Sequence, residues 1–429
     1  MKRLNRIAFS VVCCVFASQA VWAQATIDTV KVHQLNEVVV KGVRAAKEAP
    51  YAVANIKKSE LQQFSRTGKE LPFLLSRTPG ILAWGENGLG TGTSYMRIRG
   101  AAGSRINVTL DGVALNSPED QAVFWANMNS YAALLGSVQI QRGVGSSTNG
   151  DGAFGGSISM ATAFPSLIPT AEVTGSFGSF NTYNTGVSFS TGLLGKHLIF
   201  DGAYHETATD GYIDGTSGRS GSYYGGLTWL ADNFKVSYKN IGNFEKTGQA
   251  WSGVLASDYD TNFTLMSDGI YTYKDMDAAG LGKFNILTAG LVRNGKGDYT
   301  IVPYTMRDGS LWNKTTDNFY QNHNILSAVW TPNDHWSHNF AVHYTYGYGY
   351  YNEFKSQSKF AKFGLTFYDA DGNFVKRSDF VRKKGLTQHT YGIVYNTNYK
   401  DEHWDVIGGL NLQQFLGIHW GYLTYIANQ

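Results

Sequence analysis

Few side chains in this sequence are spaced for covalent or metal chemistry. Gly88-Leu-Gly90-Thr-Gly92 looks like a phosphate-binding loop, but no helix is predicted after it, as a nucleotide cradle requires. Asp369-Ala-Asp371-Gly372-Asn373 is too short for a calcium loop and predicts a hairpin tip. No Ser-His-Asp or Cys-His arrangement has a supporting motif, and these histidines lack ligand spacing on one element: His205, His323, His335, His338, His343. We therefore expect no enzyme activity, no cofactor and no metal site.

The N-terminus predicts export. Lys2, Arg3 and Arg6 precede an apolar stretch over 7–16, and Val21-Trp-Ala23 has the small residues of a cleavage site. A short membrane anchor is the alternative. We interpret residues 1–23 as a signal peptide, which contains both cysteines of the chain, Cys13 and Cys14. An exported chain without further cysteine is typical of a bacterial envelope protein rather than of a disulfide-stabilised secreted domain.

Composition narrows the class of protein. Charged residues make up 16% of the chain and aromatic residues 14%, whereas roughly a quarter charged is usual in soluble domains. The first 23 residues carry three basic and no acidic side chains, so the rest has a formal net charge of zero. This balance argues against nucleic acid as a partner. No run of 18 apolar residues follows the signal peptide, which leaves a β-barrel as the membrane-spanning option.

From about residue 170 the sequence alternates with a period of two. In the stretch 340–350, one parity is mostly aromatic (Phe340, Tyr344, Tyr348) and the other is small or polar. The stretch 234–239 repeats this pattern, with Phe234, Val236 and Tyr238 against Lys235, Ser237 and Lys239. Because successive strand residues point to opposite faces, each strand has one aromatic face. Tyrosine on that face favours a membrane interface.

The predicted connections between strands are unequal in length. Tight turns are indicated at 192–196, 231–233, 331–334 and 400–402, and long polar stretches near 206–221, 244–318 and 352–388. Short turns at one rim and long loops at the other are typical of outer-membrane barrels. A soluble β-sandwich or propeller with one wet face is the alternative interpretation.

About nine strands are predicted over 166–429. Single-chain outer-membrane barrels have even strand numbers, and an open edge in lipid leaves backbone groups unpaired. We therefore expect this sequence to be an N-terminal fragment of a longer chain, the alternative being an eight-stranded barrel with a frayed end. The predicted fold is a mixed α/β domain over 45–165 followed by antiparallel transmembrane β-barrel strands that form part of a larger barrel.

The mixed α/β region has its own local signals. Thr67 and Glu70 have the spacing of a capping box ahead of a helix that begins at Leu71, and Pro79-Gly80 ends it. Strands are predicted over 96–100, 106–110 and 138–141, and Asp111-Gly112 predicts a hairpin turn.

Four stretches of the first half together resemble a TonB-dependent outer-membrane receptor of the kind found in Bacteroidetes, in family order and at family-like spacing. They are the TonB-box-like 35–42 (LNEVVVKG), the plug-like 71–81 (LPFLLSRTPGI), the central 97–115 (RIRGAAGSRINVTLDGVAL) and the closing 136–160 (GSVQIQRGVGSSTNGDGAFGGSISM). The resemblance implies a periplasmic leader over 24–44, a plug domain over 45–165 and part of a barrel of about 22 strands over 166–429. It places the protein in the outer membrane of a Gram-negative cell, in contact with lipid.

The resemblance also implies roles for two groups of residues. Arg99 and Arg142 stand where family arginines pair with barrel glutamates, so they are expected to form a charge lock that holds the plug. Glu37, Val38, Val39 and Val40 form an extended segment that can add to a sheet edge of a partner. By resemblance that partner is TonB, together with its energising complex in the inner membrane. A disordered leader and ordinary surface arginines are the simpler alternatives.

Ligand contact is expected from two plug loops. Trp84, Phe124 and Trp125 have rings that could stack on a ligand, and Glu86, Asn87 and Gln121 could hydrogen-bond to it. Packing of these loops against the barrel wall is the alternative. The resemblance implies energy-coupled import of a scarce chelate, which in this family is most often a ferric siderophore or iron complex. Cobalamin, haem or an oligosaccharide remain open as ligands, and a passive outer-membrane porin or adhesin remains open as a class.

Overall fold

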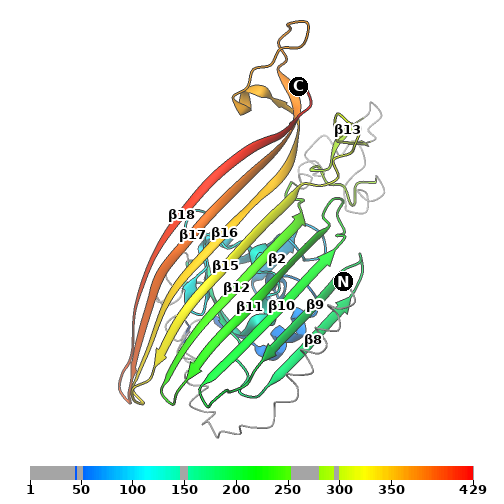
Figure 1. Ribbon diagram of the computed structural model, residues 1–429. Coiled ribbons are helices and arrows are strands. Elements are labelled where there is room, and N and C mark those ends of the chain that lie inside the picture. Colours follow the sequence, from blue (N-terminus) through cyan, green and yellow to red (C-terminus); the bar gives the residue numbers. More distant parts are fainter. Residues whose placement is uncertain (1–43, 46–51, 145–152, 253–279, 294–298, 429) are drawn as a thin grey trace.

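The computed structural model describes residues 44–45, 52–144, 153–252, 280–293 and 299–428 (Figure 1). The predicted signal peptide and the TonB-box-like residues Glu37–Val40 lie outside the described residues. The described residues form two parts, which are an N-terminal domain built on a small mixed sheet and a long, curved antiparallel sheet. None of the described helices is long and apolar enough to cross a membrane.

The N-terminal domain is built on a five-stranded sheet. Its strands, in the order β1-β6-β7-β4-β5, are β1 (Ala52–Lys57), β6 (Leu135–Arg142), β7 (Gly156–Thr162), β4 (Ile106–Leu110) and β5 (Val113–Ala114). β4 and β7 run parallel, and the other neighbours are antiparallel. The predicted strands at 106–110 and 138–141 are confirmed. So is the hairpin turn, where Asp111 and Gly112 both have positive φ (51° and 84°), as a type I′ turn requires.

Short helices and a small hairpin complete the domain. The helices are α3 (Lys58–Ser65), α4 (Leu71–Leu75) and α5 (Tyr131–Leu134), with single 3₁₀ turns η1 (Gly103–Arg105) and η2 (Trp125–Met128). β2 (Ile81–Gly85) pairs with β3 (Ser94–Ile98). The helix from Leu71 is confirmed, but its predicted capping box is wrong. The Thr67 hydroxyl donates to the Phe64 carbonyl oxygen at the end of α3, and the Glu70 side chain turns into the domain instead.

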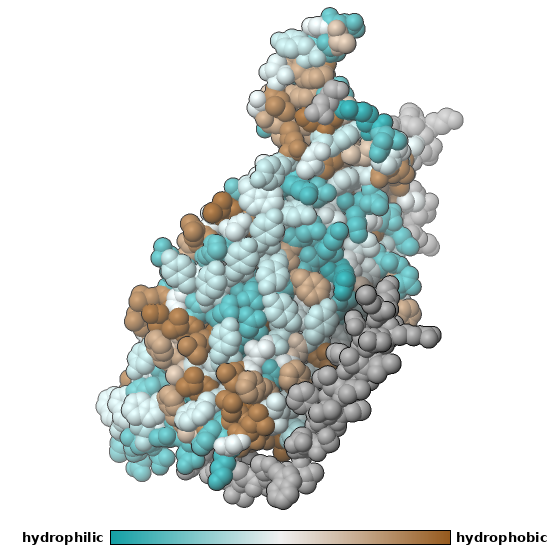
Figure 2. All heavy atoms as spheres, viewed as in Figure 1, coloured by the Kyte–Doolittle hydropathy of each residue, from teal (hydrophilic) through white to brown (hydrophobic). Residues whose placement is uncertain are grey.

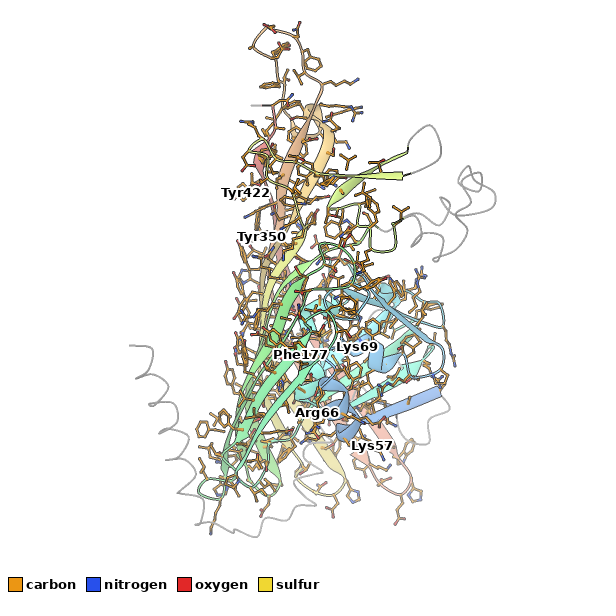
Figure 3. All side chains as sticks on the ribbon, turned by 90° about the vertical axis from the view of Figure 1, so that its right-hand side faces the viewer. Lys57, Arg66, Lys69, Phe177, Tyr350 and Tyr422 are labelled. Atoms are coloured by element: carbon orange, nitrogen blue, oxygen red, sulfur yellow. The ribbon has the colours of Figure 1, made fainter. Side chains whose placement is uncertain are left out.

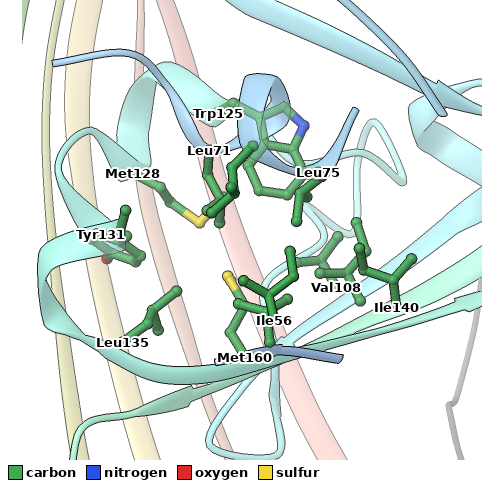
Figure 4. Close-up of a cluster of buried hydrophobic side chains, with 14 of the residues drawn as sticks. Ile56, Leu71, Leu75, Val108, Trp125, Met128, Tyr131, Leu135, Ile140 and Met160 are labelled. Atoms are coloured by element: carbon green, nitrogen blue, oxygen red, sulfur yellow. The ribbon is translucent and has the colours of Figure 1, made fainter. Parts of the chain in front are cut away.

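Helices and sheet enclose one apolar core (Figure 4). α3 contributes Leu61 and Phe64, three residues apart and both buried, which gives the helix one apolar side. α4 adds Leu71, Leu74 and Leu75, whereas β4 and β6 supply buried β-branched residues. Trp125 and Met128, the first and last residues of η2, also pack into the core.

The long sheet has nine strands in the described residues, as the sequence predicted. In chain order they are β8 (Thr170–Phe177), β9 (Tyr183–Ser190), β10 (Leu198–Thr209), β11 (Gly218–Leu230), β12 (Phe234–Gly248), β15 (Thr316–Trp330), β16 (Trp336–Lys359), β17 (Arg377–Lys400) and β18 (Asp405–Ile426). Each pairs antiparallel with the next. β8 and β18 are the two edges of this sheet, which does not close within the described residues.

The two faces of the long sheet differ as the alternation predicted. On β16, Phe340, Val342 and Tyr344 are exposed, whereas Ala341 and His343 between them are buried. The N-terminal domain packs on the buried face, which we call the inner face (Figure 3). Figure 2 shows the opposite outer face, where hydrophobic side chains gather in the lower half of the view.

The predicted inequality of the connections is also present. Short turns join the strands at the lower rim in Figure 1. At the upper rim the connections after β10, β12 and β16 are longer, whereas β8 and β9 are joined by a short turn. The predicted loops at 206–221, 244–318 and 352–388 are too long, because strands extend into each of these stretches. β10 continues to Thr209, β16 to Lys359, and β17 begins at Arg377. These polar residues belong to strands because register pairing continues there, as in the pairs Glu353–Arg382 and Lys359–Arg377 between β16 and β17. The hairpin of β13 (Ala289–Arg293) and β14 (Tyr299–Pro303) lies within the longest connection.

Glu70 is the buried acidic residue that joins three parts of the N-terminal domain. It lies directly before α4, and its carboxylate accepts hydrogen bonds from Ser94 Oγ (3.1 Å) on β3 and Asn129 Nδ2 (3.2 Å) after η2. Burial raises the pKa of Glu70 well above the ordinary 4.5, and hydrogen bonds from Asn129, Ser94 and the Gly92 backbone offset only part of that rise. The domain therefore keeps its internal cross-link at a cost that depends on pH.

We predict that Glu70→Gln stabilises the chain increasingly as pH rises. A carboxyl whose pKa is raised by folding contributes its full stability below the unfolded value near 4.5 and loses it as pH rises through the folded value. The neutral amide avoids that loss. Thermal melting of the full chain at pH 4, 6 and 8 should show the variant melting above the wild type at pH 8, with the difference shrinking towards pH 4. Glu402→Gln, at an exposed turn, is the control; an equal difference at all three pH values would contradict the prediction.

Candidate functional site

A buried ion pair fixes the N-terminal domain to the inner face of the long sheet. Lys239 Nζ on β12 lies 2.6 Å from Asp111 Oδ2 in the β4–β5 turn, and both side chains are at most 10% exposed. Asp111 also accepts hydrogen bonds from the backbone N–H (3.0 Å) and the hydroxyl (2.8 Å) of Thr162. Burial alone would raise the pKa of Asp111, but the Lys239 ammonium and the bonds from Lys239 and Thr162 outweigh it and hold the pKa below its ordinary value.

An apolar contact lies beside this ion pair. Val113, two residues after Asp111, packs in a small buried cluster with one residue from each of three neighbouring strands: Ile325, Ala341 and Val394. Ile325 is the register partner of Lys239, so the charged and apolar contacts are adjacent on the sheet. The tip of the β4–β5 hairpin is therefore seated on four strands of the long sheet.

Further contacts follow the inner face of β12 upwards. The Tyr131 hydroxyl donates to Asn243 Oδ1 (2.9 Å), and just after the strand Thr93 Oγ1 donates to Gln249 Oε1 (2.9 Å). Lys239, Asn243 and Gln249 share one parity, which is why a single strand can meet the domain along its length. β12 is the line of docking between the two parts.

Above this line, a cavity of about 1060 Å³ opens between the N-terminal domain and the inner face. From the domain its lining includes Trp84, Glu86, Tyr95, Arg97, Glu119 and Phe124. From the sheet it includes Glu245, Asp317, His323, Tyr351, Arg382, Lys384 and Trp420, and from the connection after β12 it includes Trp251. Rings and hydrogen-bonding groups alternate on both sides, so the cavity can hold a ligand that carries planar groups and polar substituents.

The aromatic part of the cavity floor is preassembled. The rings of Trp84 and Tyr95 are stacked with centroids 5.5 Å apart, both about 40% exposed, and Arg97 lies over the Trp84 ring at 6.0 Å. Stacking of this kind limits ring motion before a ligand arrives. β2 and β3 place this pair, because Trp84 and Tyr95 are register partners in their hairpin.

Glu86 connects this floor to the long sheet. Its carboxylate accepts a hydrogen bond from the Tyr95 hydroxyl (2.6 Å) and another from the backbone N–H of Ala250 (2.9 Å), at the root of the longest connection. Burial raises the pKa of Glu86, and the bonds from Tyr95 and Ala250 oppose that rise. Glu86 therefore holds ring and strand end together at the cavity edge.

Of the six residues expected to contact a ligand, four line the cavity: Trp84, Glu86, Phe124 and Trp125. Trp125 is only 5% exposed and belongs to the core of the domain. Asn87 and Gln121 lie outside the lining. Asn87 is buried and shapes its own loop, since Oδ1 accepts from the N–H groups of Leu89 and Gly90. The Gln121 amide donates to the Pro118 carbonyl oxygen (2.8 Å).

The two arginines expected to lock the plug lie together around the Pro79-Gly80 turn. The Arg142 guanidinium donates to the Pro79 carbonyl oxygen (2.7 Å), and the Arg99 backbone N–H donates to that of Gly80 (2.8 Å). Neither forms an ion pair with a described carboxylate. Within the described residues, the buried ion pair between the N-terminal domain and the long sheet is that of Asp111 and Lys239. In the sequence, Asp111 is marked only as a turn residue and Lys239 only as one parity of a strand.

Residues 45–157 match the family described as TonB-dependent Receptor Plug Domain. No curated protein matches the chain in sequence. The region of the match contains the five-stranded sheet up to the start of β7, the helices and the cavity floor.

Several solved receptor structures resemble the whole fold. The pyoverdine outer-membrane receptor FpvA of Pseudomonas aeruginosa has a TM-score of 0.58 at 12% identity, covering 88% of this chain and 48% of that chain. The ferric preacinetobactin receptor BauA of Acinetobacter baumannii gives 0.56 at 14%, covering 88% and 49%. The ferric-catecholate import receptor Fiu of E. coli gives 0.55 at 12%, covering 86% and 49%. The chain thus spans about half the length of these receptors.

At these identities the resemblance concerns the fold, and the domain match concerns residues 45–157 alone. The family model matches the plug, and the structural resemblance covers the plug together with the antiparallel sheet. Residues 45–157 are accordingly a plug domain of the TonB-dependent receptor family, and the strands that follow have the fold of the barrel wall in these receptors.

Proposed function

We propose that this chain belongs to an outer-membrane receptor that imports an iron chelate, such as a ferric siderophore, by TonB-driven rearrangement of the plug. The observation that carries the proposal is the plug itself, docked through the buried Asp111–Lys239 pair beneath a cavity with an aromatic floor. The similar structures are those of a pyoverdine receptor, a ferric preacinetobactin receptor and a ferric-catecholate import receptor, which supports this class of ligand.

The long sheet is suited to a membrane. Its outer face exposes aliphatic and aromatic side chains along the lower half of the strands, and Trp229, Trp330 and Trp336 stand near the short turns, where aromatic residues favour the lipid–water interface. β16 and β17 have 24 residues each, roughly 80 Å of strand, which exceeds a hydrocarbon core of about 30 Å even when tilted. Their polar upper ends would then stand outside the cell and surround the cavity.

The ligand would enter from that side and settle on the plug. Trp84 and Phe124 would stack on its planar groups. A ligand that displaces the Tyr95 ring would also disturb the hydrogen bond from Tyr95 to Glu86. Passage requires the plug to leave the wall, so the Asp111–Lys239 pair must open. Arg99 and Arg142 would contribute further charge contacts to parts of the wall beyond the described residues.

Opening the plug needs work, and the outer membrane holds no nucleotide or potential to supply it. Glu37–Val40 would pair with a sheet edge of TonB by main-chain hydrogen bonds, and the inner-membrane complex would pull on it. A receptor for cobalamin, haem or an oligosaccharide would use the same machinery with a different cavity lining. A passive porin or adhesin would have no use for this segment.

We predict that deleting Glu37–Val40 in the full-length gene abolishes uptake and spares ligand binding. Cells are grown on single ferric chelates as the iron source, and binding of the same chelates is measured on de-energised cells. Deleting Asp28–Lys31, four residues of the same leader, is the matched control and should leave growth intact. Unchanged growth without Glu37–Val40 would favour the passive class.

We predict that Asp111→Asn loosens the plug. Removing one partner of a buried ion pair leaves the other charge uncompensated, at a cost of about 3–5 kcal/mol. A protease should therefore cleave the plug of the detergent-solubilised variant faster than that of the wild type, because opening of the plug costs less free energy.

Asp405→Asn is the matched control for that experiment. It breaks an exposed pair with Lys400 (3.1 Å, side chains 44% and 59% exposed), for which less than about 1 kcal/mol is expected. Equal cleavage rates for the two variants would show that Asp111–Lys239 does not hold the plug.

A further inference from the structure

Arg44, the last residue of the leader, and Ala45, the first residue of the plug, are bound to the polar face of the plug sheet. The Arg44 guanidinium donates four hydrogen bonds to two neighbouring strands. On β6 it reaches Ser137 Oγ (3.0 Å) and the Ser137 carbonyl oxygen (3.3 Å), and on β7 it reaches Ser159 Oγ (3.3 Å) and the Ser159 carbonyl oxygen (3.0 Å). One rigid planar group therefore spans two strands.

The next residue is held as well. The Ala45 backbone N–H donates to Gln139 Oε1 (2.7 Å), and Gln139 Nε2 donates back to the Ala45 carbonyl oxygen (3.3 Å). The glutamine amide thus pairs with a backbone amide as another strand would. Gln139 is 9% exposed and is the register partner of Ser159. We call Arg44, Ala45, Ser137, Gln139 and Ser159 the leader clamp.

The clamp lies close to the contact that fixes the plug to the wall. Ser159 and Thr162 are both on β7, three residues apart, and Thr162 donates two hydrogen bonds to Asp111, the partner of Lys239. β7 is paired on both sides, with β6 and with β4. One central strand therefore connects Arg44 to the ion pair on the wall.

Without the clamp, a pull on the leader would act first on β1. Among the strands that the structure describes, β1 is an edge of the plug sheet and pairs only with β6, beginning at Ala52–Arg142. An edge strand pulled from its end loses its hydrogen bonds one after another, which takes little force. The four bonds of Arg44 must instead break together, and they attach to strands in the middle of the sheet.

We propose that Arg44 is a positioning residue that transmits tension on the leader past β1 to β7, and through Thr162 to the Asp111–Lys239 pair. The inference rests on the proposed function, because it needs a partner that pulls. Arginine is suited to this position since its planar fork can donate to two strands at once, whereas a lysine ammonium is a single point.

The test is single-molecule pulling on the full-length receptor in lipid nanodiscs, with the handle attached to the leader and the disc held by the barrel. In the wild type, the first event should be a high-force rupture. Arg44→Ala should lose that event and show an early low-force extension of the length of β1. Arg44→Lys should lower the rupture force without abolishing the event. Arg105→Ala, which removes an exposed plug arginine, should behave as the wild type.

Ser159→Ala is a second variant for the case that Arg44→Ala fails to fold, since it removes one acceptor and leaves the backbone intact. It should lower the first rupture force below that of the wild type. An unchanged first event in Arg44→Ala, or in Ser159→Ala if only that variant folds, would overturn the proposal. Because the handle replaces TonB, this result does not depend on uptake; intact growth after deletion of Glu37–Val40 would sink the proposed function alone.

Discussion

The docking of the plug depends on one buried ion pair. Asp111 and Lys239 are both almost completely removed from water, and each is tolerable there only because of the other. The pair sits at the tip of a two-residue turn, so its position is set by the β4–β5 hairpin and by the register of β12. Thr162 donates two further hydrogen bonds to the carboxylate and ties it to the central strand of the plug. The buried ion pair therefore fixes where the plug docks, and opening it must return both charges to water together.

The one-sidedness of the long sheet allows this arrangement. Small residues and polar groups on its inner face leave room for the plug and offer it partners, whereas the outer face carries the aromatic and aliphatic side chains. Docking contacts gather along β12 because alternate residues of one strand point the same way. The upper halves of β15 to β18 extend beyond the plug, and the cavity lies between these strand ends and the floor made by β2 and β3. The same alternation of side chains therefore provides the docking contacts lower on the sheet and the cavity lining higher up.

The cavity and the docking contacts are linked through the plug. Glu86 touches both the aromatic floor and the root of the longest connection, whereas Arg44 and Asp111 lie at two ends of a path through β7. A ligand above and a pull from the leader would thus act on one small domain from two sides. The apolar core beneath α3 and α4 joins these contacts within one packed domain.

Much of the architecture was predictable from the sequence, because it depends on local rules. Alternation with a period of two fixed the faces of strands such as β16, and turn residues such as Asp111-Gly112 marked hairpins whose backbone demands them. Strand ends were less predictable, since β16 continues to Lys359 by register pairing with β17 rather than by its own composition. The roles of polar residues were the least predictable. Asn87 and Trp125 have side chains suited to a ligand, yet in the tertiary structure Asn87 hydrogen-bonds within its own loop and Trp125 packs in the core. Lys239 and Asp111 are 128 residues apart in the chain. Only the docking of the plug brings them within 2.6 Å, because burial, and not residue type, decides which charges must pair.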